Sequence, residues 1–567
     1  MKGFQESKKN NNSKKLKKGF NENNNFILFN KAIRMQQKGD LIKAAEIYQK
    51  LITNNFLEEK VFLNYATVCQ LLKNSNNAIL LFREAIKINP KNYIPFFKMG
   101  FILNNKGNFY EAYPFARKAI ELNPKLWQGF HNLIKILINL HRPKDAIDIA
   151  MTAKNLFSNN HLFSGLLGDI YSDIGNFEEA EKYYKIAISL APNDDETIYS
   201  FANFSMGIGN KIESIKYLNK VLENNPKHTI SYYLLSTIIN VEKDLDIKNK
   251  IIRLRLDDFK TNKDRFNVLF SKSHIFHKLN EFSKSGEVLT QANDLKLKDK
   301  PSNVKEVINL AQTIKYKTSM DKSFDISRFN CLRDIFIVGL PRSGSTLVES
   351  IIGMNRDVYN LGENSILHNA LLESEESNYA ELDELYLKYS NYFSSKKYTT
   401  NKLLSNYMYI PHLISKLEHS KVIYTFRHPL DNLLSMYRAK FTGIGNEYSS
   451  SLIDSARYYI YQFKIMSFYK EKYKKCIYFL NYDRLVNKPE FEIRKLVSWL
   501  GFDWDDSYLY PYKSQQAFFT ASNVQVRSPI NNKSVGGWEK YSKIMNEPLN
   551  YFIKNDFSLD SFENLID

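Results

Sequence analysis

Cysteine is scarce in this chain: Cys69, Cys331 and Cys476 are the three among 567 residues. So few cysteines exclude a disulfide framework, and no CxxC pair or Cys/His cluster indicates structural zinc. Long hydrophobic runs are lacking too, since no apolar stretch reaches the roughly 18 residues of a membrane-spanning helix. The N-terminus has no apolar core of a secretory signal. We therefore expect a cytoplasmic protein.

Acidic residues are in the minority, because 79 Lys and Arg against 61 Asp and Glu give a net charge of +18. Residues 1–25 carry +5 of this charge, residues 26–330 carry +12, and residues 331–567 carry only +1. The Lys- and Asn-rich residues 1–25 predict a disordered, solvated tail. Since such basic tails are common and often do little, nucleic acid is not the partner we expect.

A repeat with a period of 34 residues fills the first half of the sequence. Glycine recurs five residues before a small residue, and such a pair suits a tight turn followed by a close helix–helix contact. A single hairpin of this kind cannot bury its apolar face, so the repeats are predicted to stack into a solenoid. The small residues are Ala44, Ala78, Ala112, Ala146, Ala180 and Ser214; the glycines are Gly39, Gly107, Gly175 and Gly209; the prolines are Pro90, Pro124, Pro192 and Pro226.

This pattern resembles the tetratricopeptide repeat family over about residues 30–233. Residues 234–300 resemble one or two degenerate repeats, with Ser285 at the small position. We predict about six to eight hairpins over residues 26–300, followed by a linker with a connecting helix at 301–330. The resemblance implies a groove that binds a peptide or protein, and a purely structural spacer is the alternative.

The most informative motif is a glycine-containing loop between a strand, predicted at Asp334–Leu340, and a helix, predicted at Thr346–Ile352. A loop that enters a helix N-terminus in this way presents backbone N–H groups to a phosphate. Its spacing matches the ATPase phosphate loop except that Ser345 replaces the lysine, which disfavours a kinase or ATPase. Arg342 can instead hold an oxyanion with two hydrogen bonds. The candidate loop residues are Pro341, Arg342, Ser343, Gly344, Ser345 and Thr346.

A second anion site is predicted after another strand, Val422–Phe426. Arg427 follows this strand directly, and Ser435 lies eight residues later on the predicted helix. Arginine at the carboxyl end of a parallel strand, with a hydroxyl from the next helix, suits a phosphate group.

The two segments together resemble the sulfotransferases, and the resemblance extends through nearly all of residues 333–545. It is closest to the protein-tyrosine sulfotransferases and to bacterial proteins that fuse tetratricopeptide repeats to such a domain. It implies an α/β P-loop-like domain with a parallel sheet over residues 331–567. It also implies 3′-phosphoadenylyl sulfate (PAPS) as co-substrate, without a metal, and a 3′-phosphate held by Arg427 and Ser435. The family often has Asp where this sequence has His428.

The resemblance also assigns catalytic roles. Glu363 corresponds to the family's base, Lys402 to a lysine on the leaving phosphate, and Ser522 to a serine at the phosphosulfate. Tyr482 resembles a nucleotide-contacting tyrosine. Relatives have a basic residue before Trp538 where this chain has Gly537, so we expect Lys533 or Lys540 to supply that phosphate contact.

The prediction is therefore an α-helical solenoid followed by a sulfotransferase domain that transfers a sulfuryl group from PAPS to a hydroxyl. A protein tyrosine, bound through the repeat groove, is the favoured acceptor. A glycan or a small-molecule alcohol stays open as the acceptor. A binding scaffold with an inactive transferase domain also stays open.

Overall fold

The structure, a computed structural model, describes residues 24–318, 332–376, 381–417, 419–441, 445–514 and 523–565. The chain divides into two compact units, Met1–Ser158 and Asn159–Asp567. This division falls inside the repeats. The expected domain boundaries at 25/26, 300/301 and 330/331 stay predictions.

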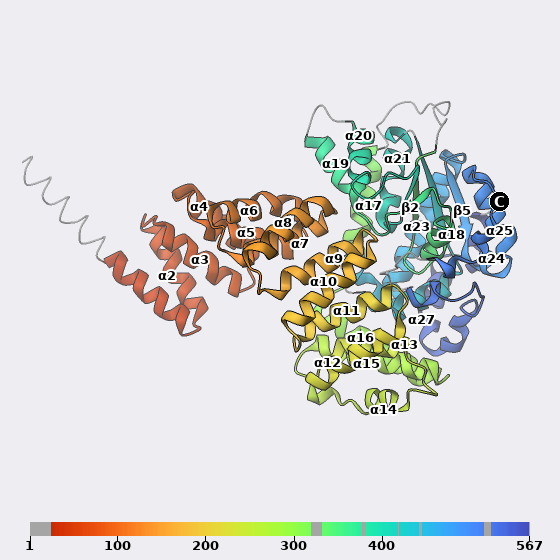
Figure 1. The fold of residues 1–567 in the computed structure, drawn as a ribbon, viewed down its shortest axis with the longest axis horizontal. Coiled ribbons are helices and arrows are strands. Elements are labelled where there is room, and N and C mark those ends of the chain that lie inside the picture. Colours follow the sequence, from red (N-terminus) through yellow and green to blue (C-terminus); the bar gives the residue numbers. More distant parts are fainter. Residues whose placement is uncertain are drawn as a thin grey trace, which may run out of the picture. The chain divides into compact units, whose positions relative to one another are not determined.

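The first unit consists of antiparallel helix hairpins (Figure 1). A helix over residues 24–37 precedes the first labelled helix. The helices that follow are α2 (Leu41–Thr53), α3 (Glu59–Leu71), α4 (Ser75–Ile88), α5 (Tyr93–Asn105), α6 (Phe109–Leu122), α7 (Trp127–Asn139) and α8 (Pro143–Leu156). The helical solenoid predicted from the 34-residue period is confirmed.

The recurring small residues have the packing role that their spacing predicts. All six are fully buried at 0% exposure, from Ala44 to Ser214. The turn five residues before each of them has a left-handed residue: φ is +81° at Gly39 and +91° at Gly209. The same position holds Lys73 with φ +61° and His141 with φ +52°. The turn geometry is therefore kept in every repeat, even where glycine is absent.

The second unit begins with further repeats. Their helices are α9 (His161–Asp173), α10 (Phe177–Leu190), α11 (Asp195–Gly207), α12 (Lys211–Asn224), α13 (Thr229–Ile238), α14 (Leu245–Arg253), η1 (Leu256–Asp258), α15 (Asn262–Lys278) and α16 (Phe282–Asp299). Helix α17 (Val304–Thr318) follows them, within the predicted linker. The degenerate repeat is present as the α15–α16 hairpin. Its turn has Asn280 at φ +61°, and Ser285 is fully buried. The short helix α14 interrupts the regular pattern before it.

A parallel sheet of five strands forms the centre of the second unit, in the order β2-β3-β1-β4-β5. The strands are β1 (Asp334–Gly339), β2 (Val358–Asn360), β3 (Tyr398–Asn401), β4 (Ser420–Phe426) and β5 (Ile477–Asn481). In register, Phe336 of β1 lies beside Asn401 of β3 and Val422 of β4. The predicted α/β domain with a parallel sheet is therefore present.

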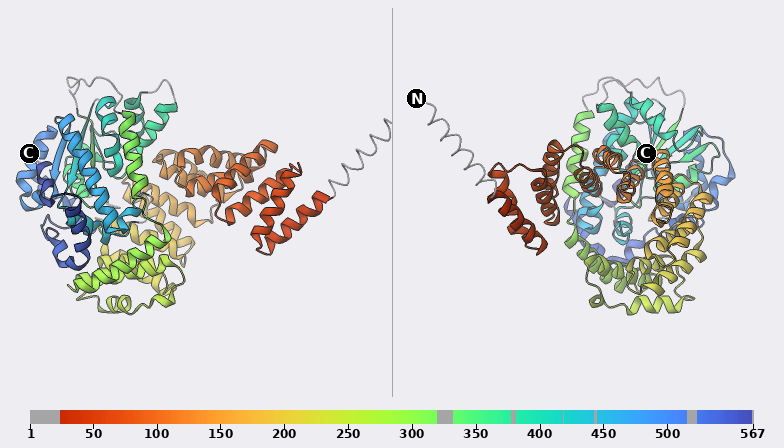
Figure 2. Two further views of the ribbon diagram at one scale, coloured as in Figure 1. Left: turned by 180° about the vertical axis from the view of Figure 1, so that it is seen from behind. Right: turned by 60° about the vertical axis from the view of Figure 1, so that its left-hand side comes forward.

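Helices cover both faces of this sheet (Figures 1 and 2). Because strand side chains alternate, Phe336 and Val338 of β1 face one core while Ile335 and Ile337 face the other. The second core is covered by α18 (Ser345–Ile352), α24 (Tyr482–Asn487) and α25 (Pro489–Leu500). The first is covered by α17, α19 (Ile366–Glu376), α20 (Leu382–Ser390), α21 (Ile410–Lys416), α22 (Pro429–Arg438), α23 (Leu452–Lys472) and α27 (Ser542–Lys554).

The repeats of the second unit share a core with the sheet. Phe270 of α15 and Leu289 of α16 belong to the same apolar cluster as Phe336. Polar contacts join them as well, since Asn293 donates to the backbone oxygen of Tyr437 at 3.0 Å. The last repeats and the sheet region therefore fold as one body. In the part of the chain that the structure describes, no helix is long and apolar enough to cross a membrane.

Candidate active site

The predicted site segments begin where the five strands end. The phosphate loop follows β1, Glu363 follows β2, Lys402 follows β3, Arg427 follows β4, and Tyr482 follows β5. Because all five strands are parallel, these residues meet at one edge of the sheet. Ligands of open α/β sheets bind at this carboxyl edge.

The phosphate loop is held in place by two neighbouring strands. The Ser343 hydroxyl donates to the Leu340 oxygen at 2.7 Å and lies 2.7 Å from the hydroxyl of Thr425 on β4. Gly344 has φ +95°, and a Cβ there would lie 2.3 Å from Cδ2 of Tyr482. The Pro341 oxygen accepts from Asn432 at 3.0 Å.

Helix α18 starts directly after Gly344, at Ser345 and Thr346, both of which are buried. The N-terminal end of α18 therefore borders the loop, and the positive end of the helix dipole suits an anion.

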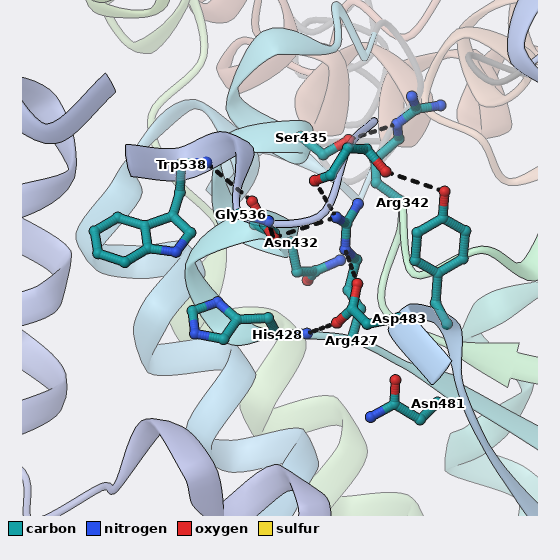
Figure 3. A network of polar contacts seen from close by, with 12 residues as sticks. Arg342, Arg427, His428, Asn432, Ser435, Asn481, Asp483, Gly536 and Trp538 are labelled. Atoms are coloured by element: carbon teal, nitrogen blue, oxygen red, sulfur yellow. Dashed lines mark hydrogen bonds and ion pairs between the residues drawn. The ribbon is translucent and has the colours of Figure 1, made fainter. Parts of the chain in front are cut away.

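Arg342 points from this loop toward α22. Its Nε donates to the Ser435 hydroxyl at 3.1 Å (Figure 3). Its Nη2 donates to Gln525 at 2.7 Å. Burial, together with the positive charges of Arg427 and Arg438, lowers the pKa of Arg342 to about 10. A bound anion would relieve this repulsion between the guanidinium groups.

Arg427 is buried and lies in an internal network (Figure 3). Its Nη2 donates to the Ser534 oxygen at 2.8 Å, and it lies 3.5 Å from Asp431 and 3.7 Å from Asp483. Its guanidinium is 4.8 Å from the ring of Tyr482, whose hydroxyl lies 3.1 Å from that of Ser534. The structure thus brings Arg427 and Tyr482 together, while Ser435 is paired with Arg342.

His428 follows Arg427 at the position where the sulfotransferases often have Asp. In this structure the nearby carboxylate is that of Asp483. The backbone N–H of His428 donates to Asp483 at 2.7 Å, so a carboxylate from α24 contacts this segment. Burial raises the pKa of Asp483, and the charge of Arg427 opposes that rise. The His428 ring stacks on Trp538 at 6.0 Å.

Glu363 and Lys402 form an ion pair of 2.7 Å. The Lys402 side chain is 1% exposed, while that of Glu363 is 53% exposed. The Lys402 ammonium is therefore buried in the wall of the site, whereas the Glu363 carboxylate is open to solvent.

A second carboxylate, not predicted from the sequence, lies beneath this pair. Glu349 of α18 is buried, and its Oε1 accepts from the Thr400 hydroxyl and from the Gly362 N–H, each at 3.1 Å. Burial raises the pKa of Glu349, and the charge of Lys402 opposes that rise. The only signal in the sequence was a glutamate within the apolar run of the phosphate-loop helix.

Three further predicted residues have different outcomes. Ser522 lies outside the described residues. Lys533 is exposed, and Ser534 beside it makes the contacts to Arg427 and Tyr482. Lys540 lies 5.3 Å from the ring of Phe282 on α16. At Gly537 an added Cβ would make an ordinary contact with Asp431, at 3.7 Å.

A metal site was not expected. Within the described ranges, no group of three or more His, Cys, Asp or Glu side chains is placed to hold a metal ion.

Comparisons with known proteins agree with this geometry. Residues 372–506 match the model of the sulfotransferase family. Segments 59–92, 96–126 and 164–194 match the tetratricopeptide repeat. The chain combines tetratricopeptide repeats with a sulfotransferase-family domain.

The relatives are distant. An uncharacterised protein of Aquifex aeolicus is 25% identical over 405 residues, which are 59% of this chain and 51% of that protein. Human protein O-mannosyl-transferase TMTC3 is 24% identical over 240 residues, 38% of this chain and 26% of that protein. The chain thus spans about half or less of the length of these curated relatives. The structure of YrrB, a TPR protein with an unusual peptide-binding site, is 19% identical over 34% of this chain and 98% of its own, with a TM-score of 0.28.

Proposed function

We propose that this chain transfers a sulfuryl group from PAPS to a hydroxyl group, with a protein tyrosine as the acceptor. The observation that carries the proposal is the 2.7 Å pair of Glu363 and Lys402 at the sheet edge that also holds Arg342. A base next to a cation, beside a loop built for an anion, suits transfer of an anionic group to a hydroxyl.

PAPS would supply the sulfuryl group and leave as adenosine 3′,5′-bisphosphate when the bond from sulfur to the bridging oxygen breaks. The converging guanidinium groups of Arg342 and Arg427, the helix N-terminus at Ser345 and the ring of Tyr482 form a fitting set for such a nucleotide. Ser435 completes this set through its contact with Arg342.

Glu363 would accept the proton of the acceptor hydroxyl while the acceptor oxygen forms its bond to sulfur. Its exposure allows an acceptor to approach it, and Lys402 holds it in place. Lys402 would donate to the bridging oxygen as negative charge develops there, and Arg342 would stabilise the transferring group. Ser522 and Lys533 stay predicted contacts to the phosphosulfate and to a phosphate.

The repeats would bind the acceptor protein. Helix-hairpin solenoids commonly expose an extended concave surface for a peptide or protein. In the second unit they pack against the transferase region: Arg527 donates to the Gly207 oxygen at 3.1 Å, and Tyr359 donates to the Ile174 oxygen at 3.1 Å. This packing supports a role for the repeats close to the site of transfer.

The test is transfer of labelled sulfate from PAPS to a library of tyrosine peptides and to host extract, with the product identified by mass spectrometry. The Glu363→Gln variant should lower kcat by about 10²–10⁴-fold and leave the affinity for adenosine 3′,5′-bisphosphate unchanged, since only the base is lost. Glu490→Gln, an exposed change on α25, is the matched control. Label that reaches no hydroxyl, or full turnover by Glu363→Gln, would contradict the proposal.

A further inference from the structure

Tyr541 is a buried tyrosine through which the transferase region contacts the last repeat hairpin, α15–α16. It is the last residue of the short helix η7 (Gly537–Tyr541). Its hydroxyl donates to the Ser285 hydroxyl of α16 at 2.9 Å and lies 2.9 Å from Nδ1 of His277 on α15. Its ring stacks on the ring of His277, with the centroids 6.1 Å apart. Both helices of the hairpin therefore hold this side chain.

The hairpin matches this contact at two of its own positions. Ser285 occupies the small position, which is alanine in most of the repeats, and its hydroxyl also lies 3.0 Å from that of Ser273. Ser214 occupies the same position in an earlier repeat, yet its buried hydroxyl has no hydrogen-bond partner among the described residues. A Cβ added to Gly286 would lie 3.5 Å from Cδ1 of Tyr541, so the tyrosine ring packs on the backbone of α16. The polar small residue of this hairpin therefore receives a side chain from outside the repeats.

The other end of η7 holds a carboxylate next to Arg427. Asp431, in the first turn of α22, accepts hydrogen bonds from the backbone N–H of Gly536 at 2.7 Å and of Trp538 at 3.0 Å (Figure 3). The same carboxylate lies 3.5 Å from the Arg427 guanidinium. Its side chain is 2% exposed, so water competes little for these contacts. The backbone N–H groups at η7 therefore fix where the negative charge beside Arg427 lies.

Tyr541 and these N–H groups belong to one short stretch of helix. Tyr541 lies three residues after Trp538, which is roughly 6 Å along a 3₁₀ helix. Arg438, in the last turn of α22, lies 5.7 Å from the ring centroid of Tyr541. Helix α22 therefore contacts this stretch both through Asp431 in its first turn and through Arg438 in its last. A shift of Tyr541 would move the N–H groups that hold Asp431.

We propose that Tyr541 is a positioning residue for nucleotide binding. The α15–α16 hairpin fixes Tyr541, η7 carries its N–H groups to Asp431, and Asp431 orients the Arg427 guanidinium. Orientation matters for an arginine that binds a phosphate, because its N–H groups form a rigid fork. The proposal rests on the proposed function, in which Arg427 takes the 3′-phosphate. It gives the last repeat hairpin a role in binding the donor, in addition to the acceptor-binding role of the solenoid.

The variants that test this role each remove one hydroxyl. Tyr541→Phe keeps the ring and its stacking and loses the hydrogen bond to Ser285. Ser285→Ala removes the same hydrogen bond and introduces the alanine that most repeats have, so it serves as the second variant if Tyr541→Phe folds poorly. Tyr508→Phe is the matched control. That tyrosine is also buried, in the core on the other face of the sheet, and its hydroxyl accepts from Asn355 at 3.1 Å.

The readout is equilibrium binding of nucleotides to the full chain by calorimetry, which needs no turnover. The probes are adenosine 3′,5′-bisphosphate and adenosine 5′-phosphate, which differ only in the 3′-phosphate. Tyr541→Phe and Ser285→Ala should each weaken the bisphosphate by about fivefold, within the range of one neutral hydrogen bond. Binding of adenosine 5′-phosphate should stay within about twofold of the wild type. A role in folding alone would weaken both probes alike.

Asp431→Asn tests the route from Tyr541 to Arg427. It keeps one oxygen acceptor and removes the charge beside the guanidinium. If the two residues act through the same carboxylate, adding Tyr541→Phe to Asp431→Asn should weaken the bisphosphate by no more than about a further twofold.

Selective loss of bisphosphate affinity in Tyr541→Phe and Ser285→Ala, absent in Tyr508→Phe, supports the positioning role. Unchanged affinities, equal losses for the two nucleotides, or additive losses in the double variant overturn it. A wild-type chain that does not prefer the bisphosphate overturns it as well. If the wild-type chain binds the bisphosphate and transfers no sulfate, the proposed reaction fails, and the comparison of the variants still decides the role of Tyr541.

Discussion

The left-handed turns of the repeats and that of the phosphate loop share a backbone conformation and differ in what surrounds them. At Gly39 φ is +81°, and an added Cβ would meet nothing within 4 Å. At Gly344 φ is +95°, and an added Cβ would lie 2.3 Å from Tyr482. At Gly39 only the left-handed turn favours glycine. At Gly344 both the left-handed turn and the close approach of Tyr482 favour it.

The same two regions differ in the charges they bury. Among the described residues, the fully buried Asp, Glu, Lys and Arg side chains all lie in the transferase region. They are Asp334, Glu349, Lys402, Arg427 and Asp431. The buried polar side chains of the described repeats include Ser214, Ser231 and Asn267, and no Asp, Glu, Lys or Arg is among them. Because a buried charge costs stability, its presence points to chemistry or to ligand binding.

Among the substitutions that test this difference between the repeats and the phosphate loop, Gly344→Ala is expected to have the largest effect. The added methyl group would displace Tyr482 or the loop, and a misplacement of about 1 Å at a reacting group can cost roughly 10²-fold in rate. We expect turnover to fall by about that factor and binding of adenosine 3′,5′-bisphosphate to weaken, as measured by kinetics and calorimetry.

The matched control for this change is Gly501→Ala, in the same region. Gly501 has φ +82° and nothing within 4 Å of an added Cβ, so the conformational strain is the same and the steric clash is absent. Equal loss of nucleotide binding in the two variants would show that the contact with Tyr482 is unimportant.

The next effect concerns Glu349, the buried carboxylate beneath the Glu363–Lys402 pair. Glu349→Gln removes a charge close to Lys402 and keeps acceptors for Thr400 and Gly362. We expect kcat to fall by about tenfold, or ~1.4 kcal/mol, because Lys402 then lacks one of its two carboxylate neighbours.

The stability of Glu349→Gln, unlike its kcat, should not fall. The folded-state pKa of Glu349 is raised, so the stability it contributes is present at low pH and is lost as pH rises through that pKa. Glu349→Gln should therefore have an equal or higher melting temperature at pH 7, measured by calorimetry. A lower kcat together with a lower melting temperature would indicate a structural role alone.

Much of the fold was predictable from local patterns. The 34-residue period specified the hairpins, and the run at Asp334–Leu340 specified β1, because both signals are short-range and repeat or alternate regularly. The phosphate loop and Arg427 were predictable for the same reason, since each directly follows a strand.

The packing of the repeats on the transferase region was not predictable. Tyr233 and Lys440 are 207 positions apart, and nothing in either local pattern places one above the other. Glu349 was missed because its partners Thr400 and Lys402 come from a neighbouring strand. Ser435 stays a predicted contact to the 3′-phosphate beside Arg427. Its hydrogen bond from Arg342 was not predicted, because that contact depends on how β1 and β4 pair.

The smallest effect is expected in the repeats. Gly39→Ala introduces a side chain at φ +81° without a steric contact, so it should lower the free energy of unfolding by about 1 kcal/mol and leave turnover unchanged. The reverse change, Lys73→Gly at the equivalent turn, relieves the left-handed strain but adds freedom to the unfolded chain. Its effect should therefore lie within about 1 kcal/mol of zero in denaturant unfolding. A loss as large as that of Gly344→Ala would mean that the repeat turns, like the phosphate loop, depend on close contacts.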